Sequence, residues 1–190
     1  MNAVVCSGNP HKLEEFEVLF PDWTLSLLEG AAFPPETGRT YLENARGKAA
    51  FGRRVGPADR WMLADDSGIE VVALGGGPGV QTARWAEGRH VEKLLAALGE
   101  TGDRRARYVC ELVALAPDGR EARGTGVLDG TIALGPAGSE GFGFDPVFVP
   151  VGEERTVAEL GDAWKALNSH RARAAQALLR ALAAAPATTN

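Results

Sequence analysis

Short apolar runs alternate with amphipathic stretches along the chain, and this pattern predicts an α/β protein. Apolar runs typical of buried strands cover residues 3–6, 61–64, 69–74, 108–115 and 147–149. The turn at 117–119 predicts a hairpin whose second strand covers residues 120–128. A further turn at 129–130 is expected to lead into a short strand at 131–133. Residues 21–39 are rich in Pro and Gly, and we expect them to be irregular.

Apolar side chains at helical spacing predict five helices. The expected helices follow Asn9, run from Thr40 to about Arg53, cover residues 88–98, begin at Asp162 and follow Ser169. Their inward-facing side chains are expected to be Leu13, Phe16 and Phe20, then Leu42, Ala45, Ala49 and Ala50, then Val91, Leu94, Leu95 and Leu98, and finally Ala175, Leu178, Leu179 and Leu182.

Composition and charge narrow the class of protein. The chain has 190 residues, of which 45% are hydrophobic, and its formal net charge is -5. This length suits one domain or one domain with two lobes, which we expect over residues 1–185, with a disordered tail at 186–190. The negative net charge argues against a broad electrostatic surface for nucleic acid. Cys6 and Cys110 lie in apolar runs, and we interpret them as core residues in a reducing compartment.

Two features of the hydropathy pattern bear on localisation. An apolar strand is expected from residue 3, so no signal peptide is visible. No uninterrupted apolar run reaches the length needed to cross a membrane. We therefore expect a cytoplasmic protein with neither a membrane nor a nucleic acid as its partner.

The two adjacent aspartates Asp65 and Asp66 are the most unusual polar pair in the chain. They follow the apolar run 61–64 and precede Ser67-Gly68, so we expect them at the end of a strand. Adjacent carboxylates repel each other, and a divalent cation removes that conflict. Magnesium takes one or two carboxylates and leaves its other positions to water and substrate phosphate. The alternative is an acidic turn without a metal.

A second polar group follows the first expected strand, at Ser7 to Lys12. Asn9 is a good N-cap and Pro10 suits the first helical position. Lys12 then falls in the first helical turn, where its charge opposes the helix dipole. A strand, a Ser-Gly-Asn turn and a lysine at a helix N-terminus predict an anion site. The alternative is an ordinary connection with a solvated lysine. Gly47-Lys48 is followed by Ala49, so it does not form a Walker A loop.

Two glutamates are candidates to complete a metal site beside the aspartates. Glu43 stands three residues after Thr40, which is the spacing of a capping box, so its first task is to cap a helix. Glu36 lies in a loop and has no evident capping task. Glu36 is therefore the better metal candidate, although the sequence leaves Glu43 open.

The segment 141–146 alternates glycine with phenylalanine and ends in Asp145-Pro146. Core segments rarely have this composition, so the segment favours a binding loop. The alternative is a surface loop whose phenylalanines fold back into the core.

These pieces occur together in one order. They are Ser7-Gly8-Asn9-x-x-Lys12, Glu36-Thr37-Gly38-x-Thr40-Tyr41-x-Glu43-Asn44-Ala45, Ala64-Asp65-Asp66-Ser67-Gly68, Pro78-Gly79-Val80, Gly141-Phe142-Gly143-Phe144-Asp145-Pro146 and Lys165-x-x-x-Ser169-His170-Arg171. In this arrangement the chain closely resembles the inosine/xanthosine triphosphate pyrophosphatase family, also called HAM1-like proteins. The resemblance extends from residue 3 to about residue 180.

The resemblance implies a fold and a reaction. The implied fold is α/β, with a long, twisted, mixed sheet, flanking helices and two lobes around a nucleotide cleft. The implied reaction converts the non-canonical purine nucleoside triphosphates ITP, dITP and XTP to a monophosphate and pyrophosphate, with Mg²⁺ as cofactor. The resemblance also implies a homodimer.

The resemblance further assigns roles to residues of this chain. Asp66 is the implied proton acceptor, and Asp66 and Glu36 are the implied metal ligands. The implied substrate-binding residues are Ser7, Gly8, Asn9, Pro10, His11, Lys12, Ser67, Phe142, Gly143, Phe144, Asp145, Lys165, His170 and Arg171. The separate tasks of Asp65 and Asp66 do not follow from the sequence, and Asp65 is left as an electrostatic partner.

Base selection suggests a task for Arg171. Its guanidinium offers only donors, so we expect it to pair with O6 of hypoxanthine and to oppose the amino group of adenine. The loop at 142–145 would then leave the 2-amino group of guanine unpaired. The alternative is that Arg171 binds phosphate and the loop alone selects the base.

Two other functions fit parts of the sequence. A Maf-like nucleotide pyrophosphatase shares the reaction class, but the segment from Lys165 to Arg171 argues against it. A module that binds nucleoside triphosphate without turnover would have no use for Asp65, Asp66 and Glu36.

Overall fold

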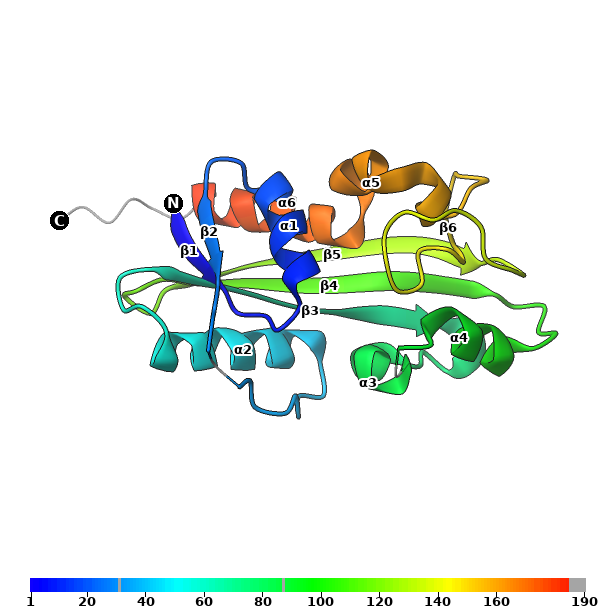
Figure 1. Ribbon diagram of the computed structural model, residues 1–190, viewed down its shortest axis with the longest axis horizontal. Helices are drawn as coiled ribbons and strands as arrows, with labels where there is room; N and C mark the ends of the chain where they lie inside the picture. The colour runs from blue at the N-terminus through cyan, green and yellow to red at the C-terminus, as the bar shows by residue number, and fades with distance from the viewer. Residues whose placement is uncertain (31, 87, 185–190) are drawn as a thin grey trace. The chain divides into compact units, whose positions relative to one another are not determined.

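The computed structural model describes residues 1–30, 32–86 and 88–184. Its six strands are β1 (Asn2–Val5), β2 (Thr24–Leu27), β3 (Trp61–Val71), β4 (Arg105–Leu115), β5 (Glu121–Ile132) and β6 (Phe148–Pro150). They form one sheet in the order β2-β1-β3-β4-β5-β6 (Figure 1). β1 pairs in parallel with β2 and β3, whereas β5 and β6 are antiparallel. The expected mixed sheet of an α/β protein is therefore confirmed.

Six α-helices accompany the sheet among the described residues. They are α1 (Pro10–Leu19), α2 (Tyr41–Val55), α3 (Thr82–Ala86), α4 (His90–Leu98), α5 (Val157–Asn168) and α6 (His170–Ala184). Two short 3-10 helices cover Val72–Leu74 and Gly79–Gln81. Within the described ranges, no helix is both long enough and apolar enough to span a bilayer.

The chain divides into two compact units, and β3, β4 and β5 contribute residues to both. Unit 1 contains Met1–Asp66, Cys110–Gly126 and the described residues from Arg171 onward. Unit 2 contains Ser67–Val109 and Val127–His170. The border along β3 therefore falls between Asp66 and Ser67, and the border after α5 falls between His170 and Arg171.

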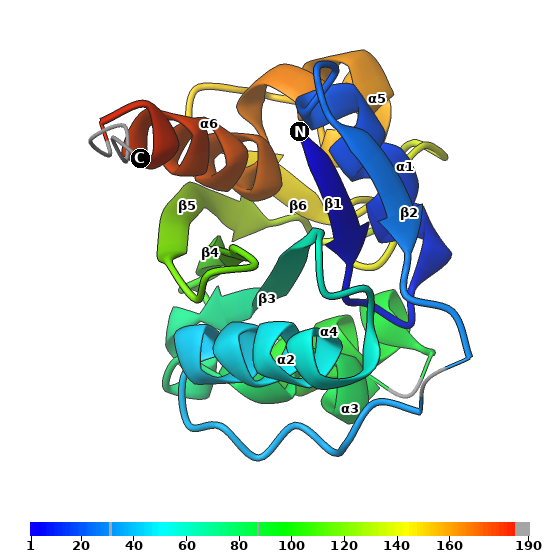
Figure 2. The ribbon, with the colours of Figure 1, turned by 90° about the vertical axis from the view of Figure 1, so that its left-hand side faces the viewer.

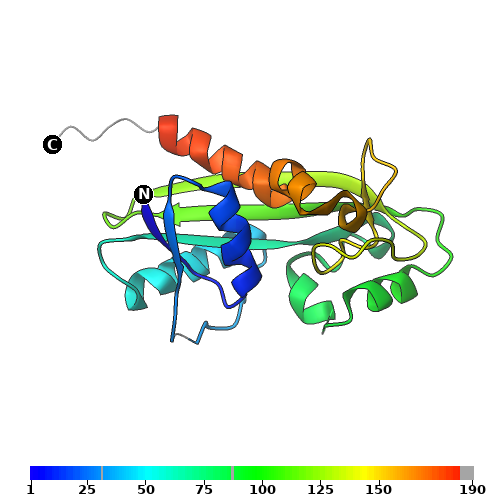
Figure 3. The same ribbon diagram turned by 45° about the horizontal axis from the view of Figure 1, so that its top comes forward.

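In unit 1 the sheet is covered on both faces, and the strands distribute their side chains alternately between the two layers. Ala3 and Val5 of β1 pack in one cluster with Phe16 of α1 and Leu178 of α6. Val4, in contrast, packs in a second cluster with residues of α2. Figures 1 and 3 show α1 and α6 on the same side of the sheet, and Figure 2 shows α2 on the other side.

Two glycines allow the helices of unit 1 to approach the strands closely. A Cβ on Gly52 of α2 would lie 2.2 Å from Cys6 Sγ, and a Cβ on Gly124 of β5 would lie 2.0 Å from the Ala174 carbonyl of α6. Either contact is far inside van der Waals distance, so a larger residue at these positions would push the helix away from the sheet. Cys6 and Cys110 are free and buried, as expected.

Unit 2 has its own core, which gathers apolar side chains from its strands and α-helices and from the connection between β5 and β6. The buried members are Ile69, Val71, Ala86, Leu94, Leu98, Ala106, Tyr108, Leu128, Ile132, Phe144, Val147, Phe148 and Val157. Phe144 and Val147 come from the connection between β5 and β6, so this connection is part of the core of the unit.

Two predicted strand ends are wrong, for the same physical reason. β3 runs without a break through Asp65 and Asp66 and ends at Val71. β5 likewise continues through Asp129 and Gly130 to Ile132. Both polar stretches suggest turns in isolation, but β3 lies between β1 and β4 in the sheet, and Gly130 of β5 pairs with Pro150 of β6. At Gly130 a Cβ would lie 2.4 Å from the Val149 carbonyl of β6, so the glycine permits a close approach to β6.

Other elements were missed or placed too late. β2 lies inside a stretch that we expected to be irregular, because it is only four residues long and half-buried. α3 was not predicted, and α5 begins at Val157, with a capping box between Thr156 and Glu159, before the expected start at Asp162. Gly161 interrupts α5 with a positive φ of 84°. The residues before and after it therefore do not share one continuous helical repeat, and the first turn is not visible as part of a longer periodic pattern.

The expected inward-facing side chains are largely confirmed, with two errors. Ala50 and Leu179 are exposed, because each lies at the edge of the apolar stripe of its helix. The expected tail at 186–190 lies outside the described residues.

Candidate functional site

Asp65 is fully buried in unit 1, among groups that donate hydrogen bonds. Lys12 Nζ of α1 lies 2.8 Å from Asp65 Oδ1, and Arg171 of α6 lies 3.3 Å from Oδ2 through Nη2. The thiol of Cys110 on the adjacent strand β4 is 3.9 Å from Oδ2. Burial alone would raise the pKa of Asp65, but the charges of Lys12 and Arg171 outweigh it and hold that pKa well below its usual range. Asp65 is therefore an ionised carboxylate inside an ion-pair network.

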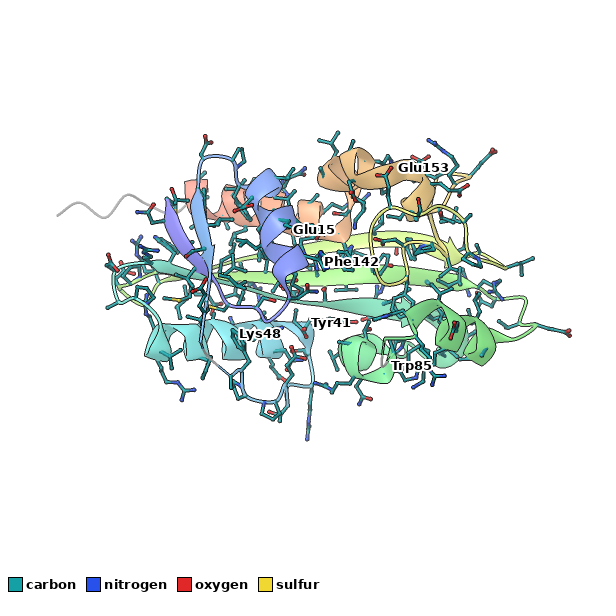
Figure 4. The ribbon with its side chains drawn as sticks, in the orientation of Figure 1. Glu15, Tyr41, Lys48, Trp85, Phe142 and Glu153 are labelled. Carbon is teal, nitrogen blue, oxygen red and sulfur yellow. The ribbon has the colours of Figure 1, made fainter. Side chains whose placement is uncertain are left out.

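Arg171 connects Asp65 to a second carboxylate. Its side chain is only 3% exposed, and its Nη1 forms an ion pair with Glu15 of α1. Figure 4 labels Glu15 on α1. Two buried or half-buried carboxylates thus face two cations, Lys12 and Arg171, so the charges of this network balance.

Asp66 points to the other face of the same strand. Its Oδ2 accepts a hydrogen bond of 2.9 Å from Asn44 Nδ2, and its Oδ1 lies 3.2 Å from Lys48 Nζ. Both partners belong to α2. Burial raises the pKa of Asp66, and the nearby charge of Glu36 adds to this effect, while Lys48 and Asn44 oppose it. Asp66 is therefore the more basic of the two aspartates, which suits a group that accepts a proton.

Lys48 holds two carboxylates from different parts of the chain. Its Nζ lies 2.8 Å from Glu36 Oε1 and 3.2 Å from Asp66 Oδ1. Burial lowers the pKa of Lys48, but the surrounding carboxylates of Asp65, Asp66 and Glu36 outweigh it and raise the pKa overall. Lys48 therefore stays charged. In Figure 4 it lies on α2, on the side of the sheet opposite to Glu15.

Asn44 ties the loop that carries Glu36 to Asp66. Its Oδ1 accepts a hydrogen bond of 2.8 Å from the Gly38 N–H, while its Nδ2 donates to Asp66. At Gly38 there is no room for a Cβ, which would lie 2.5 Å from Asn44 Oδ1. The side-chain amide thus fixes both the loop and the carboxylate.

At the start of α2 the two candidate glutamates have different contacts. Glu43 donates its N–H to Thr40 Oγ1 at 3.1 Å and accepts the Arg39 N–H at 2.6 Å, so its side chain caps α2. The cap differs from the expected box, because the side chain reaches Arg39 and not Thr40. Glu36 shares a cation with Asp66. The geometry therefore favours Glu36 over Glu43 as a metal ligand.

Sequence reasoning missed Asn44 and Lys48, although the pattern contained a signal. Both lie one helical turn apart on the stripe of α2 that carries the buried residues Ala45 and Ala49. A polar residue on an apolar helical stripe needs a buried partner. That partner is Asp66 for both residues.

The residues around Asp66 fit a magnesium ion. Mg²⁺ prefers oxygen ligands and is bound by one or two carboxylates together with water and substrate phosphates. Asp66 and Glu36 supply two carboxylates that converge on a single cationic atom, Lys48 Nζ. Among the described residues, no group of three or more His, Cys, Asp or Glu side chains could hold a metal by itself. The two carboxylates therefore fit a metal that takes its other ligands from water and substrate phosphate.

The predicted anion-binding turn has the expected local structure. Ser7 Oγ accepts the Asn9 N–H at 3.1 Å, and Asn9 Oδ1 accepts the His11 N–H at 3.1 Å as the N-cap of α1. Pro10 is the first residue of α1, and a Cβ added at Gly8 would meet nothing within 4 Å. The Lys12 side chain lies against Asp65, so it is not the solvated lysine of the alternative interpretation.

In unit 2 the other predicted residues gather around Asp145. Lys165 Nζ of α5 and the Phe142 N–H each lie 2.9 Å from Asp145 Oδ2. The Tyr108 hydroxyl is 3.3 Å from Oδ1. The Lys165 ammonium also lies 4.4 Å from the centre of the Phe142 ring, which is a cation–π distance. His170 stacks on Tyr108 with ring centres 4.6 Å apart.

The two phenylalanines of the loop differ in burial. Phe144 is 2% exposed and its ring forms a T-shaped contact with His90, while Phe142 is 38% exposed. Gly141 and Gly143 have positive φ values of 76° and 66°, which favour glycine. Each earlier interpretation of the loop thus fits one phenylalanine, since Phe144 enters the core and Phe142 stays partly exposed. Ser67 lies on β3 as the first residue of unit 2.

Comparisons with known proteins identify the family of this chain. The model of the Ham1 family matches residues 3–181. The dITP/XTP pyrophosphatase of Bdellovibrio bacteriovorus is 40% identical, with 96% of this chain and 98% of the relative covered. The dITP/XTP pyrophosphatase of Opitutus terrae is 44% identical, with 92% and 95% covered. The solved structure of a HAM1 protein from Coxiella burnetii superposes with a TM-score of 0.84 at 33% identity, over 97% of this chain and 100% of that one. This chain therefore belongs to the Ham1 family.

Proposed function

We propose that this protein hydrolyses non-canonical purine nucleoside triphosphates, namely ITP, dITP and XTP, to the monophosphate and pyrophosphate, and so removes them from the nucleotide pool. The observation that carries the proposal is the convergence of Asp66 and Glu36 on one cationic position. Membership of the Ham1 family and relatives named dITP/XTP pyrophosphatase support the substrate class.

In this proposal Asp66 and Glu36 bind Mg²⁺, and Asp66 also takes the proton from the attacking water. Bound magnesium neutralises charge on the phosphates, which is the main requirement of phosphoryl transfer. Asp66 suits the second task because its pKa is raised by burial and because Asn44 fixes its orientation. Asp65 does not share this task, since it faces Lys12 and Arg171.

The remaining predicted residues are proposed to bind substrate. The turn from Ser7 to Lys12, which also contains Gly8, Asn9, Pro10 and His11, presents the N-terminus of α1 and is suited to phosphate. In unit 2, Phe142 offers a partly exposed ring, and Lys165 and Asp145 offer a donor and an acceptor. Ser67, Gly143, Phe144, His170 and Arg171 complete the proposed set.

The oligomeric state and localisation are also proposals. A homodimer and a cytoplasmic location follow from the resemblance and the composition, with no nucleic acid or membrane as partner. Light scattering at micromolar concentration tests the first, and a monomer there would exclude the homodimer.

One assay tests the reaction. The protein is incubated with Mg²⁺ and with ITP, dITP, XTP, ATP or GTP, and both pyrophosphate and orthophosphate are measured. We expect pyrophosphate from the first three nucleotides and little from the last two. EDTA and the Asp66→Asn variant serve as controls. Orthophosphate as the sole first product would exclude cleavage between the α- and β-phosphates, and nucleotide binding without any product would favour the sensing module.

A further inference from the structure

Lys48 lies where the proposed magnesium ligands meet, and this position suggests a role that the sequence did not. We propose that the Lys48 ammonium takes the place of the divalent cation in the metal-free protein and is displaced when the metal binds. The inference rests on the proposed function in one respect only, which is that Glu36 and Asp66 are the metal ligands.

The distances leave little room for both cations. Lys48 Nζ lies 2.8 Å from Glu36 Oε1 and 3.2 Å from Asp66 Oδ1, so it already occupies the shared corner of the two carboxylates. A magnesium ion binds carboxylate oxygens at about 2.0–2.1 Å. A metal on the same two oxygens would therefore lie almost in contact with the ammonium, and like charges at that distance repel strongly.

The chemistry of lysine suits a removable placeholder. The ammonium is a compact charge at the end of a flexible four-carbon chain, and its three donors have no fixed fork geometry. It is able to neutralise Glu36 and Asp66 while the metal is absent and to swing aside by rotation about its own side-chain bonds. Without a cation of either kind, the two carboxylates would repel each other, since Glu36 Oε1 and Asp66 Oδ1 lie 2.8 Å and 3.2 Å from the same atom, Lys48 Nζ.

Asn44 keeps the ligand in place during such an exchange. It binds Asp66 through Oδ2, whereas Lys48 contacts Oδ1. The Asn44 side chain also holds the Gly38 N–H of the loop that carries Glu36. Departure of the ammonium thus exposes one oxygen of Asp66 and leaves the carboxylate anchored by the other.

The inference makes two opposite predictions for Lys48→Met, which keeps an unbranched, flexible side chain of about the length of the lysine stem and removes the charged ammonium. The metal-free variant should be less stable than the wild type, because Glu36 and Asp66 lose their shared cation. Divalent metal should nevertheless bind more tightly, because it no longer competes with an ammonium. A lysine that only supported the carboxylates would lower stability and weaken metal binding together.

The experiment measures Mn²⁺ binding without nucleotide, by the loss of the electron paramagnetic resonance signal of free Mn²⁺. Mn²⁺ shares the preference of Mg²⁺ for carboxylate and water oxygens. Lys12→Met is the matched control, because Lys12 pairs with the adjacent Asp65 on the other face of β3. We expect Kd to fall at least about tenfold in Lys48→Met and to stay within about twofold in Lys12→Met. Adding Glu36→Gln to Lys48→Met should reverse the gain.

Circular dichroism melts of each metal-free variant report folding and the expected loss of stability. Lys48→Gln is the second variant in case Lys48→Met does not fold. Unchanged or weaker Mn²⁺ binding in the folded Lys48 variant would overturn the inference, and so would a lack of Mn²⁺ binding by every variant. Pyrophosphate release from ITP by the wild type is measured separately. A failure of that assay would overturn the proposed reaction and leave the comparison of Mn²⁺ affinities valid.

Discussion

Asp65 and Asp66 are neighbours in the chain, yet their side chains bind on opposite faces of the sheet in unit 1. Asp65 binds Lys12 and Arg171 of the layer formed by α1 and α6, whereas Asp66 binds Asn44 and Lys48 of α2. The cause is the two-residue period of a strand, which sends successive side chains to opposite faces. The pair therefore does not form one dicarboxylate site, and the two residues have separate tasks that substitutions can distinguish.

Asp66→Asn should remove activity and leave the fold intact. Loss of a general base typically lowers turnover about a hundredfold or more. Stability should change by about 1 kcal/mol or less, because burial already disfavours the charge of Asp66 and Lys48 keeps Glu36 as its partner. Pyrophosphate release and a urea titration measure the two quantities. Near-wild-type turnover in a folded variant would move the role of base away from Asp66.

Asp65→Asn should show the opposite pattern to Asp66→Asn, because its main effect should be a large loss of stability. The substitution leaves Lys12 and Arg171 buried beside a neutral amide, and removal of one partner of a buried ion pair costs about 3–5 kcal/mol. The urea midpoint should therefore fall far more than in Asp66→Asn. Equal midpoints for the two variants would show that the network around Asp65 adds nothing to stability.

Asn44→Ala should weaken both the loop at Gly38 and the orientation of Asp66. The substitution leaves the Gly38 N–H and one Asp66 oxygen without their donor or acceptor, which costs about 1–3 kcal/mol for each buried group left unpaired. The concentration of Mg²⁺ needed for half-maximal activity should rise, because Glu36 and Asp66 are no longer held together. Arg46→Ala is the control on the same helix, since Arg46 is exposed and pairs with Glu121. An unchanged Mg²⁺ requirement in Asn44→Ala would exclude this positioning role.

The fold was predictable from the sequence wherever local periodicity and capping residues alone determine the element. The first strand, the Asn9 cap and the inward face of α1 followed from periodicity and capping chemistry. The errors concern elements that depend on neighbours distant in sequence. β2 exists because it pairs with β1, and β3 continues through two aspartates because both faces of the sheet supply cations and donors for them. Such partners are not visible in a local window.

The candidate site was predictable as a set of motifs, but its internal contacts were not. The sequence indicated that Lys12, Glu36 and Asp66 matter, and it left Asp65 and Asp66 without separate roles. The separation depends on which helix covers which face of β3. Lys48 was set aside because it lacks the phosphate-loop pattern, although its helical position, one turn after Asn44, places it beside Asp66. Three-dimensional proximity, and not spacing along the chain, identifies it.

The two buried thiols should make the protein less stable at alkaline pH. Burial raises the pKa of Cys6 from 9.0 to about 12 and also raises the pKa of Cys110. The folded state therefore keeps thiol protons that the unfolded state loses above pH 9, so the stabilisation is complete below that pH and declines as the pH rises toward 12. Each thiol should remove about 1.4 kcal/mol per pH unit in this window.

Urea midpoints at pH 8 and pH 10 measure this loss. The matched variant carries Cys6→Ala and Cys110→Ala, which removes both titrating groups and keeps all others. We expect its midpoint to change less between the two pH values than that of the wild type, whatever its absolute stability. The same pH dependence in both proteins would assign the alkaline loss to other groups.

Arg171 has two proposed roles, recognition of the base and support of Asp65, and the Arg171→Ala variant distinguishes them. Its guanidinium is buried and bound to Asp65 and Glu15, so the variant should be less stable than the wild type in a urea titration. Loss of a donor to O6 of hypoxanthine should also lower kcat/KM for ITP, by about tenfold to a hundredfold, while ATP, which presents an amino group there, loses less. The ratio of kcat/KM for ITP to that for ATP should therefore fall.

Lys12→Ala is the control for this prediction. It also removes a cation from Asp65 but belongs to the proposed phosphate-binding turn, so its losses of kcat/KM on the two nucleotides should be equal. An unchanged ratio in Arg171→Ala would assign Arg171 to the phosphates or to the support of Asp65, and base selection would then depend on the loop at 142–145.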